Sequence, residues 1–182
     1  MIPVYENYRD YQPPPYVREA INRLLADLPS HYLSGLQSVV LTNSATIGPG
    51  KTRRYGGRKF PQNKSLGRYF PKSRHGAAWI EIVVDNILAA HAIADFALPS
   101  FPPLQDGAFG EVLYHEIGHH LDRIIGPLSH GSEATAEAWM RRLACAYGIK
   151  HFSNLPESEK VAIKAALEEM RQKAATETRH TA

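Results

Sequence analysis

The sequence predicts a compact α+β fold, and two patterns along the chain lead to this prediction. Short stretches with strand-like composition occur at 35–42 and 77–84, which are rich in β-branched residues, and at 66–70, which ends in two aromatic residues. Longer stretches carry apolar residues at helical spacing, at 16–28, 106–124 and 133–147. With 182 residues the chain can bury a sizeable core, so we expect one domain over residues 1–182.

The first 67 residues contain one helix, one strand and a long loop by these criteria. Residues 1–12 are polar and rich in tyrosine, and we expect them to be irregular. The helix follows Pro15, a residue suited to a helix start, and its apolar positions form one face: Val17, Ala20, Ile21, Leu24, Leu25 and Leu28. After the strand at 35–42, residues 43–67 are rich in Gly, Pro and basic residues and predict a long loop.

The strongest strand pattern follows at 77–84, and we expect it to form a hairpin with 66–70. Residues 85–98 fit a short helix moderately well. Asp106 can cap the next helix, which we expect to end at Gly126-Pro127. Ser132 is suited to cap a helix over 133–147, and a last helix is expected over 154–175.

Composition excludes several classes of protein. Cys145 is the single cysteine, so neither an internal disulfide nor a cysteine-rich zinc finger can form. The N-terminal residues lack a basic segment followed by an apolar run, so we expect no signal peptide and a cytoplasmic location, with leaderless export left open. No apolar run approaches the length of a membrane span. The oligomeric state is not indicated.

The pattern His-Glu-x-x-His at 115–119 carries the clearest chemistry. On a helix, His115 and His119 lie on one face and can bind one zinc ion through ring nitrogens. Glu116 is rotated by about 100° from His115 and lies beside the metal. From there it can act as a general base on a zinc-bound water.

A third zinc ligand is expected from the next helix. The break at Gly126-Pro127 lets the chain reverse, so the first turn of the helix at 133–147 can return to the histidines. Glu133 and Glu137 are four residues apart on one face. One can bind zinc while the other accepts a hydrogen bond from a ligand histidine.

These motifs resemble those of the gluzincin zinc metallopeptidases, and most closely the anthrax lethal factor catalytic domain and the Pro-Pro endopeptidases. The likeness covers about residues 79–147 and rests on His115, Glu116, Gly118, His119, Asp122 and the run Ser132-Glu133-Ala134. It implies a zincin-like fold and zinc-dependent hydrolysis of peptide bonds. Carried over, the ligands are His115, His119 and Glu133, with Glu116 as general base and Glu137 supporting a histidine.

One position departs from these relatives. They carry an oxyanion-stabilising tyrosine seven residues before the ligand glutamate, where this chain has Gly126. His130 is the nearest polar substitute and is our candidate for this catalytic role. Tyr114 and Tyr147 are weaker candidates.

The strand at 79–84 matches the edge strand that zincins place above the active-site helix. An extended peptide substrate could add to such an edge through main-chain hydrogen bonds, although an ordinary core strand would show the same pattern.

Two further stretches suggest anion binding. Residues 45–52 resemble a phosphate-binding loop, but Ala45 stands where glycine is needed and no good helix follows. We therefore expect no nucleotide site.

The other stretch, residues 51–74, carries nine basic and four aromatic residues and no acidic ones. A solvated loop is the simpler interpretation. The alternative function is a non-catalytic zincin-like domain that binds nucleic acid or a protein partner through this segment.

Overall fold

The computed structural model describes residues 2–50, 52–55, 58–74, 76–90, 102–125, 132–153, 155–165 and 168. Its contacts divide the chain into two units, Met1–Tyr147 and Gly148–Ala182. The expectation of a single domain stays a prediction. The residues of the candidate site that are described below belong to the first unit.

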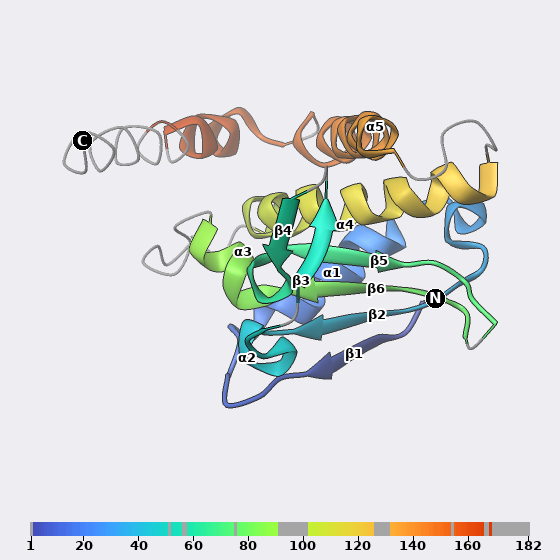
Figure 1. Ribbon diagram of the computed structural model, residues 1–182. Helices are drawn as coiled ribbons and strands as arrows, with labels where there is room; N and C mark the ends of the chain where they lie inside the picture. The colour runs from blue at the N-terminus through green and yellow to red at the C-terminus, as the bar shows by residue number, and fades with distance from the viewer. Residues whose placement is uncertain are drawn as a thin grey trace. The chain divides into compact units, whose positions relative to one another are not determined.

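The first unit is a mixed α+β structure (Figure 1). Its main sheet, as far as the chain is described, has four strands in the order β1 (Val4–Asn7), β2 (Leu36–Thr42), β6 (Ala78–Val83) and β5 (Gly67–Phe70). The strands β1, β2 and β6 are parallel, whereas β5 is antiparallel to β6. The expected α+β class, the three strands and the hairpin between 66–70 and 77–84 are therefore confirmed.

Two expectations for the first half are wrong. Residues 4–7 form β1 instead of an irregular segment, because Val4 is buried and the strand pairs along β2. The expected loop at 43–67 contains α2 (Ser44–Ile47), an antiparallel pair of β3 (Thr52–Tyr55) and β4 (Arg58–Pro61), and the 3-10 helix η2 (Gln62–Lys64). Glycine and proline are frequent in this segment and disfavour regular structure, so the sequence pattern did not reveal these short elements.

The core lies between the sheet and two helices. Helix α1 (Tyr16–Ala26) buries five of the six residues of the predicted apolar face, namely Val17, Ala20, Ile21, Leu24 and Leu25. The sixth, Leu28, lies beyond the end of the helix and is partly buried against the core. Helix α4 (Pro102–Ile125) packs on α1 and lies across β5 and β6 (Figure 1). Phe109, Leu113, Ile117 and Leu121 of α4 are fully buried, at the helical spacing that one covered face requires.

Helix α4 starts earlier than predicted, so Asp106 does not cap it. Pro102 and Pro103 open the helix, where a missing backbone N–H costs little. Asp106 is fully buried and accepts two hydrogen bonds from Arg23, at 3.1 and 2.6 Å, and one from the hydroxyl of Tyr147. The carboxylate thus joins α1, α4 and the following helix.

The remaining helices agree with the sequence more closely. Helix α3 (Val84–Ala90) follows β6, and α5 (Glu133–Phe152) begins with the expected cap, since Thr135 N–H donates to Ser132 Oγ at 3.1 Å. A 3-10 turn, η1 (Ser30–Leu33), precedes β2. In the second unit residues 157–165 are helical. No helix within the described ranges is long and apolar enough to cross a membrane.

Candidate metal centre

Helix α4 presents both histidines of the predicted motif to one side. His115 and His119 are one turn apart, and their ring centroids lie 4.9 Å from each other in an edge-to-face arrangement. Their side chains are 26% and 13% exposed, so both rings are mostly packed against the protein but remain accessible to solvent. The helix therefore positions two imidazoles at one place on its surface.

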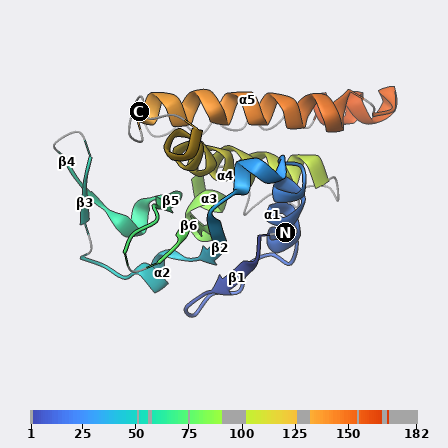
Figure 2. The same ribbon diagram turned by 90° about the vertical axis from the view of Figure 1, so that its right-hand side faces the viewer.

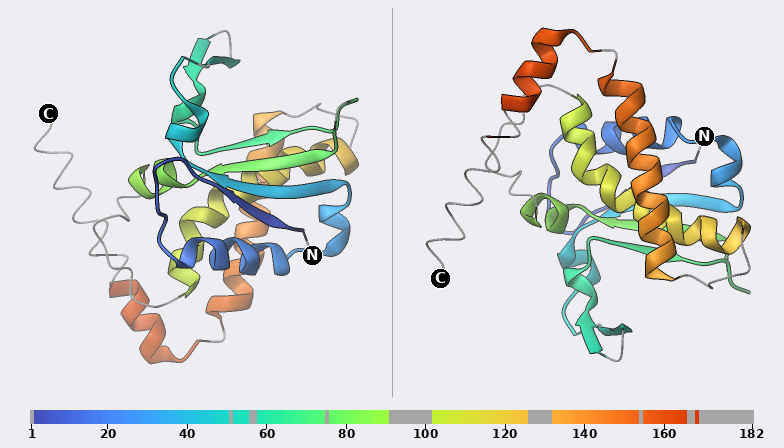
Figure 3. Two further views of the ribbon diagram at one scale, coloured as in Figure 1. Left: turned by 90° about the horizontal axis from the view of Figure 1, so that it is seen from below. Right: turned by 90° about the horizontal axis from the view of Figure 1, so that it is seen from above.

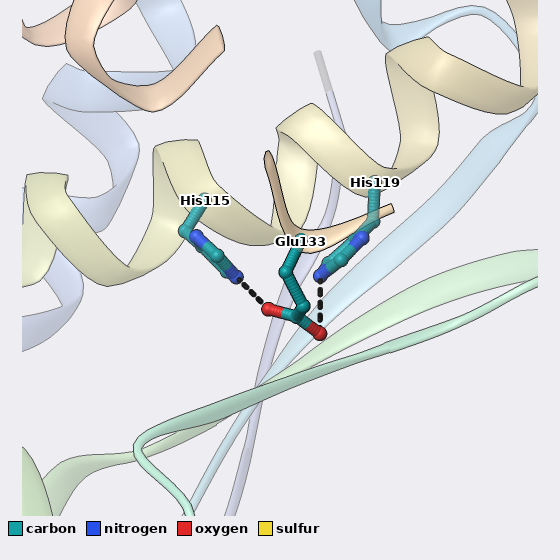
Figure 4. Close-up of side chains that lie close together, drawn as sticks. All are labelled: His115, His119 and Glu133. Atoms are coloured by element: carbon teal, nitrogen blue, oxygen red, sulfur yellow. Dashed lines mark hydrogen bonds and ion pairs between the residues drawn. The ribbon is translucent and has the colours of Figure 1, made fainter. Parts of the chain in front are cut away.

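Helix α5 brings the third group. Glu133 lies in its first turn, and its two carboxylate oxygens face the two Nε2 atoms, at 3.2 Å from His115 and 3.7 Å from His119 (Figure 4). This approach depends on Gly118, because a Cβ at that residue would lie 2.6 Å from the carbonyl oxygen of Ala136. The absence of a side chain at 118 thus lets the two helices lie in contact.

These three side chains form a group that could hold a metal ion. The nearest nitrogen or oxygen atoms of His115, His119 and Glu133 all lie within 4.8 Å of one another. Two imidazole nitrogens and one carboxylate are the donors of many catalytic zinc sites, in which the fourth position stays open. The donor chemistry fits zinc, and the three residues are the ones that the sequence indicated.

Glu137 lies behind this group, on the far side of His115. One of its oxygens is 3.8 Å from His115 Nδ1, and the other accepts hydrogen bonds from Arg141 at 3.0 and 3.2 Å. This carboxylate favours a proton on Nδ1, which leaves Nε2 free to face Glu133. The arrangement agrees with the supporting role expected for Glu137.

Glu116 lines a pocket of about 520 Å³ that also reaches His115. Apolar side chains from α3, α4 and α5 line the pocket: Ala90, Val112 and Met140. Its polar lining includes Glu111, Glu116 and Glu137. Glu116 itself is only 7% exposed. A carboxylate so placed can exchange a proton with a molecule that enters the pocket beside His115.

Gly67 is a site residue that motif analysis missed. It opens β5 and lines the pocket, and a Cβ there would lie 3.0 Å from Glu116 Oε1 and 2.7 Å from Val112 Cγ1. The strand can approach the helix this closely only because residue 67 has no side chain. A glycine inside a strand-like stretch was the available signal, since it often marks a close approach.

Of the two interpretations left open for the strand at 79–84, the ordinary core strand is confirmed and the edge strand is wrong. The strand at 79–84 corresponds to β6, which is bonded on both sides, by β2 and by β5. Within the described part of the chain, β5 is the outer strand on that side (Figure 2). Its start, at Gly67, lines the pocket.

His120 follows a ligand candidate but points into the core. It is 1% exposed, its Nε2 donates to the carbonyl of Ser34 at 3.0 Å, and its Nδ1 accepts from the hydroxyl of Tyr69 at 3.1 Å. Burial lowers the pKa of His120 below its usual range, so the ring stays neutral. Its role is to link α4 to β5.

The group that would stabilise an oxyanion is not identified. His130 and Gly126 both lie outside the described residues. The two weaker candidates are occupied elsewhere, because Tyr147 donates to Asp106 and Tyr114 donates to the carbonyl of Leu24 at 3.5 Å. Burial raises the pKa of both tyrosines above the usual range.

The phosphate-like loop after β2 is filled by the protein itself. Asp85 accepts hydrogen bonds from the backbone N–H of Ser44 at 2.9 Å and from its hydroxyl at 2.5 Å, at the start of α2. A carboxylate thus sits where a phosphate would have to bind, and α2 has only four residues. This geometry supports the expectation that no nucleotide binds there.

Comparisons with known proteins return no relative. No family model matches the chain, and neither a curated protein nor a solved structure matches it.

Proposed function

We propose that this protein is a zinc-dependent endopeptidase of the gluzincin type with a zincin-like fold. The observation that carries the proposal is the convergence of His115, His119 and Glu133 from two helices. Zinc bound by these groups would polarise the carbonyl of the scissile bond and lower the pKa of a water molecule toward ~7. Glu133 and the two imidazoles would hold the ion, and Glu137 would orient His115.

Glu116 is the general base in this proposal. Three observations support this role: Glu116 lines the same pocket as His115, it is nearly buried, and Gly67 lies close to its carboxylate. Glu116 would take the proton of the water molecule and later pass it to the leaving amine.

The outer edge of β5 is the proposed docking site for the substrate backbone. This strand lies against α4, and its first residue lines the pocket that holds Glu116. An extended peptide added to β5 would gain main-chain hydrogen bonds and would pass the metal group. The arrangement of an outer antiparallel strand along the histidine-bearing helix also supports the zincin-like assignment.

A peptide-library experiment tests this function. The purified protein is supplied with zinc and incubated with a mixed-sequence library, with and without a chelator, and cleaved bonds are identified by mass spectrometry. We expect cleavage that the chelator abolishes and zinc restores. Glu116→Gln should keep its zinc and lose cleavage by a factor of at least about 10². Cleavage by Glu116→Gln at the wild-type rate would rule out the mechanism.

A further inference from the structure

The pocket beside the metal group (His115, His119 and Glu133) follows helix α4. Residues four apart lie one above the other on a helix, so Glu111, His115 and His119 form one row along α4. The metal group takes up one end of this row. Glu111 lines the pocket at the other end, one turn before His115, which is about 6 Å along the helix axis. The pocket thus leads from the metal group toward the N-terminal part of α4.

Helix α5 supplies a second wall of the pocket. It crosses α4 at the contact between Gly118 and Ala136, and the views from the side and from above show it on the side of α4 away from the sheet (Figure 1, Figure 3). Glu137 and Met140 follow Ala136 on α5 and line the pocket. The pocket therefore lies in the angle between two crossed helices.

The pocket adjoins the outer edge of β5. Val83 N–H of β6 donates to the carbonyl of Leu66 at 2.8 Å, so Leu66 directs its main-chain groups toward β6. Main-chain groups of neighbouring residues in a strand point to opposite edges, and Gly67 therefore presents its N–H and C=O outward. Since Gly67 also lines the pocket, a peptide strand that bonds to it would bring one of its side chains to the pocket.

The lining of the pocket combines apolar side chains with carboxylates. Its larger apolar residues are Leu66, Val112 and Met140, and its carboxylates are Glu111, Glu116 and Glu137. None of the described lining residues is Lys or Arg. Glu116 and Glu137 have parts in the proposed mechanism, whereas Glu111 is an exposed residue without one. The pocket therefore suits a ligand that has an apolar stem and a positive end.

We propose that the pocket receives a Lys or Arg side chain of the peptide substrate and that Glu111 binds the charged end. The proposal rests on the peptidase function above. The apolar stem of such a side chain packs along Val112 and Met140, and it is long enough to cover the distance of about 6 Å between the turns of His115 and Glu111. An acidic side chain would be repelled by the carboxylates.

The position of Glu111 fits the charge of the metal group. A zinc ion at the histidines would repel a positive group placed directly beside it, so the charged end has to lie away from the ion. Glu111 lies one turn from His115, on the side opposite to His119. A long basic side chain satisfies both conditions, because its stem separates its charge from the metal group.

The kinetic test begins with the peptide library and the zinc-loaded protein. Lys and Arg should be enriched at one fixed position relative to the cut bond. Replacing that residue by norleucine, which keeps the stem and lacks the charge, should lower kcat/KM by at least about tenfold. Glu111→Gln should remove most of this difference, and Glu111→Lys should shift the preference toward Glu. Glu19→Gln, an exposed change on α1, is the matched control and should alter nothing.

A binding test gives a readout that does not depend on hydrolysis. Two labelled peptides differ only in carrying Lys or acetyl-lysine at alternate positions, so that in an extended strand one of these side chains reaches the pocket in several registers. Fluorescence anisotropy measures their binding to the zinc-loaded Glu116→Gln protein. We expect the Lys peptide to bind about tenfold tighter, and the advantage should shrink with added salt and with the further change Glu111→Gln.

Two results would overturn the proposal. One is a preference for Lys or Arg that Glu111→Gln leaves unchanged in both tests. The other is equal or better cleavage and binding of the uncharged peptides by protein with Glu111 intact, which would assign the pocket to apolar side chains.

The two tests separate this proposal from the proposed function. Cleavage that requires zinc but shows no preference for a basic side chain would contradict the assignment of the pocket and leave the peptidase standing. Tighter, Glu111-dependent binding of the Lys peptide by a zinc-loaded protein that cleaves nothing would reject the peptidase and keep the site for a basic side chain.

Discussion

Gly118 of α4 lies directly against the backbone of Ala136 in α5, where an added Cβ would be 2.6 Å from the carbonyl oxygen and 2.8 Å from Cα. Both neighbours are backbone atoms, so no side chain can turn aside to make room. The contact lies between His115 and His119 on one helix and near Glu133 on the other. The approach of these two helices thus brings the metal group together.

Gly118→Ala should therefore separate the helices and weaken the metal group. We expect a loss of about 1–3 kcal/mol in the free energy of unfolding and a large loss of zinc affinity. Gly107→Ala is the matched control, because an added Cβ at that exposed helical residue would have no neighbour within 4 Å. It should stabilise the protein by about 0.5–1 kcal/mol. Denaturant unfolding and zinc titration measure both effects, and equal behaviour of the two variants would contradict the role of Gly118.

Gly67→Ala should impair catalysis without removing zinc. The new methyl group would press on Val112 and Glu116, and Glu116 would have to move away from the reacting water. We expect kcat/KM to fall by about 10²-fold, with unchanged zinc content. Gly76→Ala, in the turn after β5, meets nothing within 4 Å and should keep full activity. Wild-type kcat/KM in a folded, zinc-loaded Gly67→Ala protein would disprove this role.

Asp106→Asn should lower stability more than a surface charge change does. The carboxylate is fully buried and joins Arg23 to Tyr147, whereas Arg23 keeps a third of its side chain exposed and can partly recover its hydration. We expect a loss of about 2–3 kcal/mol in the free energy of unfolding. Glu157→Gln, which breaks the exposed pair with Lys160, should change it by less than about 0.5 kcal/mol. Thermal and denaturant unfolding compare the two, and similar small losses would contradict this view of Asp106.

Helical periodicity and the spacing of metal ligands can be predicted from the sequence, because both relate residues that are three or four positions apart in the same helix. The apolar face of α1 and the four-residue spacing of His115 and His119 are of this kind, and both are confirmed as local structure. The meeting of Glu133 with the two histidines is also predictable, because the sequence carries the helix-breaking pair Gly126-Pro127 and the cap Ser132 between the two helical patterns.

What could not be predicted depends on contacts between distant segments. Asp106 resembles a helix cap in the sequence because its partners, Arg23 and Tyr147, are far away along the chain. The short strand β1 is stabilised by its pairing with β2, which no local pattern reveals. The strand at 79–84 matches an edge strand by its pattern, but strand order is set by which elements pair, and β5 covers that edge.

Glu137→Gln should weaken zinc binding without abolishing it. Its carboxylate lies 3.8 Å from His115 Nδ1 and is not part of the group of candidate ligands. Loss of such a supporting charge should reduce zinc affinity by about 10–100-fold. Competition with a zinc chelator of known affinity measures the change. An affinity equal to wild type would show that Glu137 does not support His115.

The central claim is that His115, His119 and Glu133 bind one catalytic zinc ion. Metal analysis of the purified chain after zinc loading and desalting tests it most directly, on wild type, Glu116→Gln and Glu133→Ala. We predict one zinc per chain in wild type and Glu116→Gln, and little or none in Glu133→Ala. Full zinc occupancy in a folded Glu133→Ala protein would contradict the claim and move the third ligand elsewhere, with Glu137 or His130 next in line.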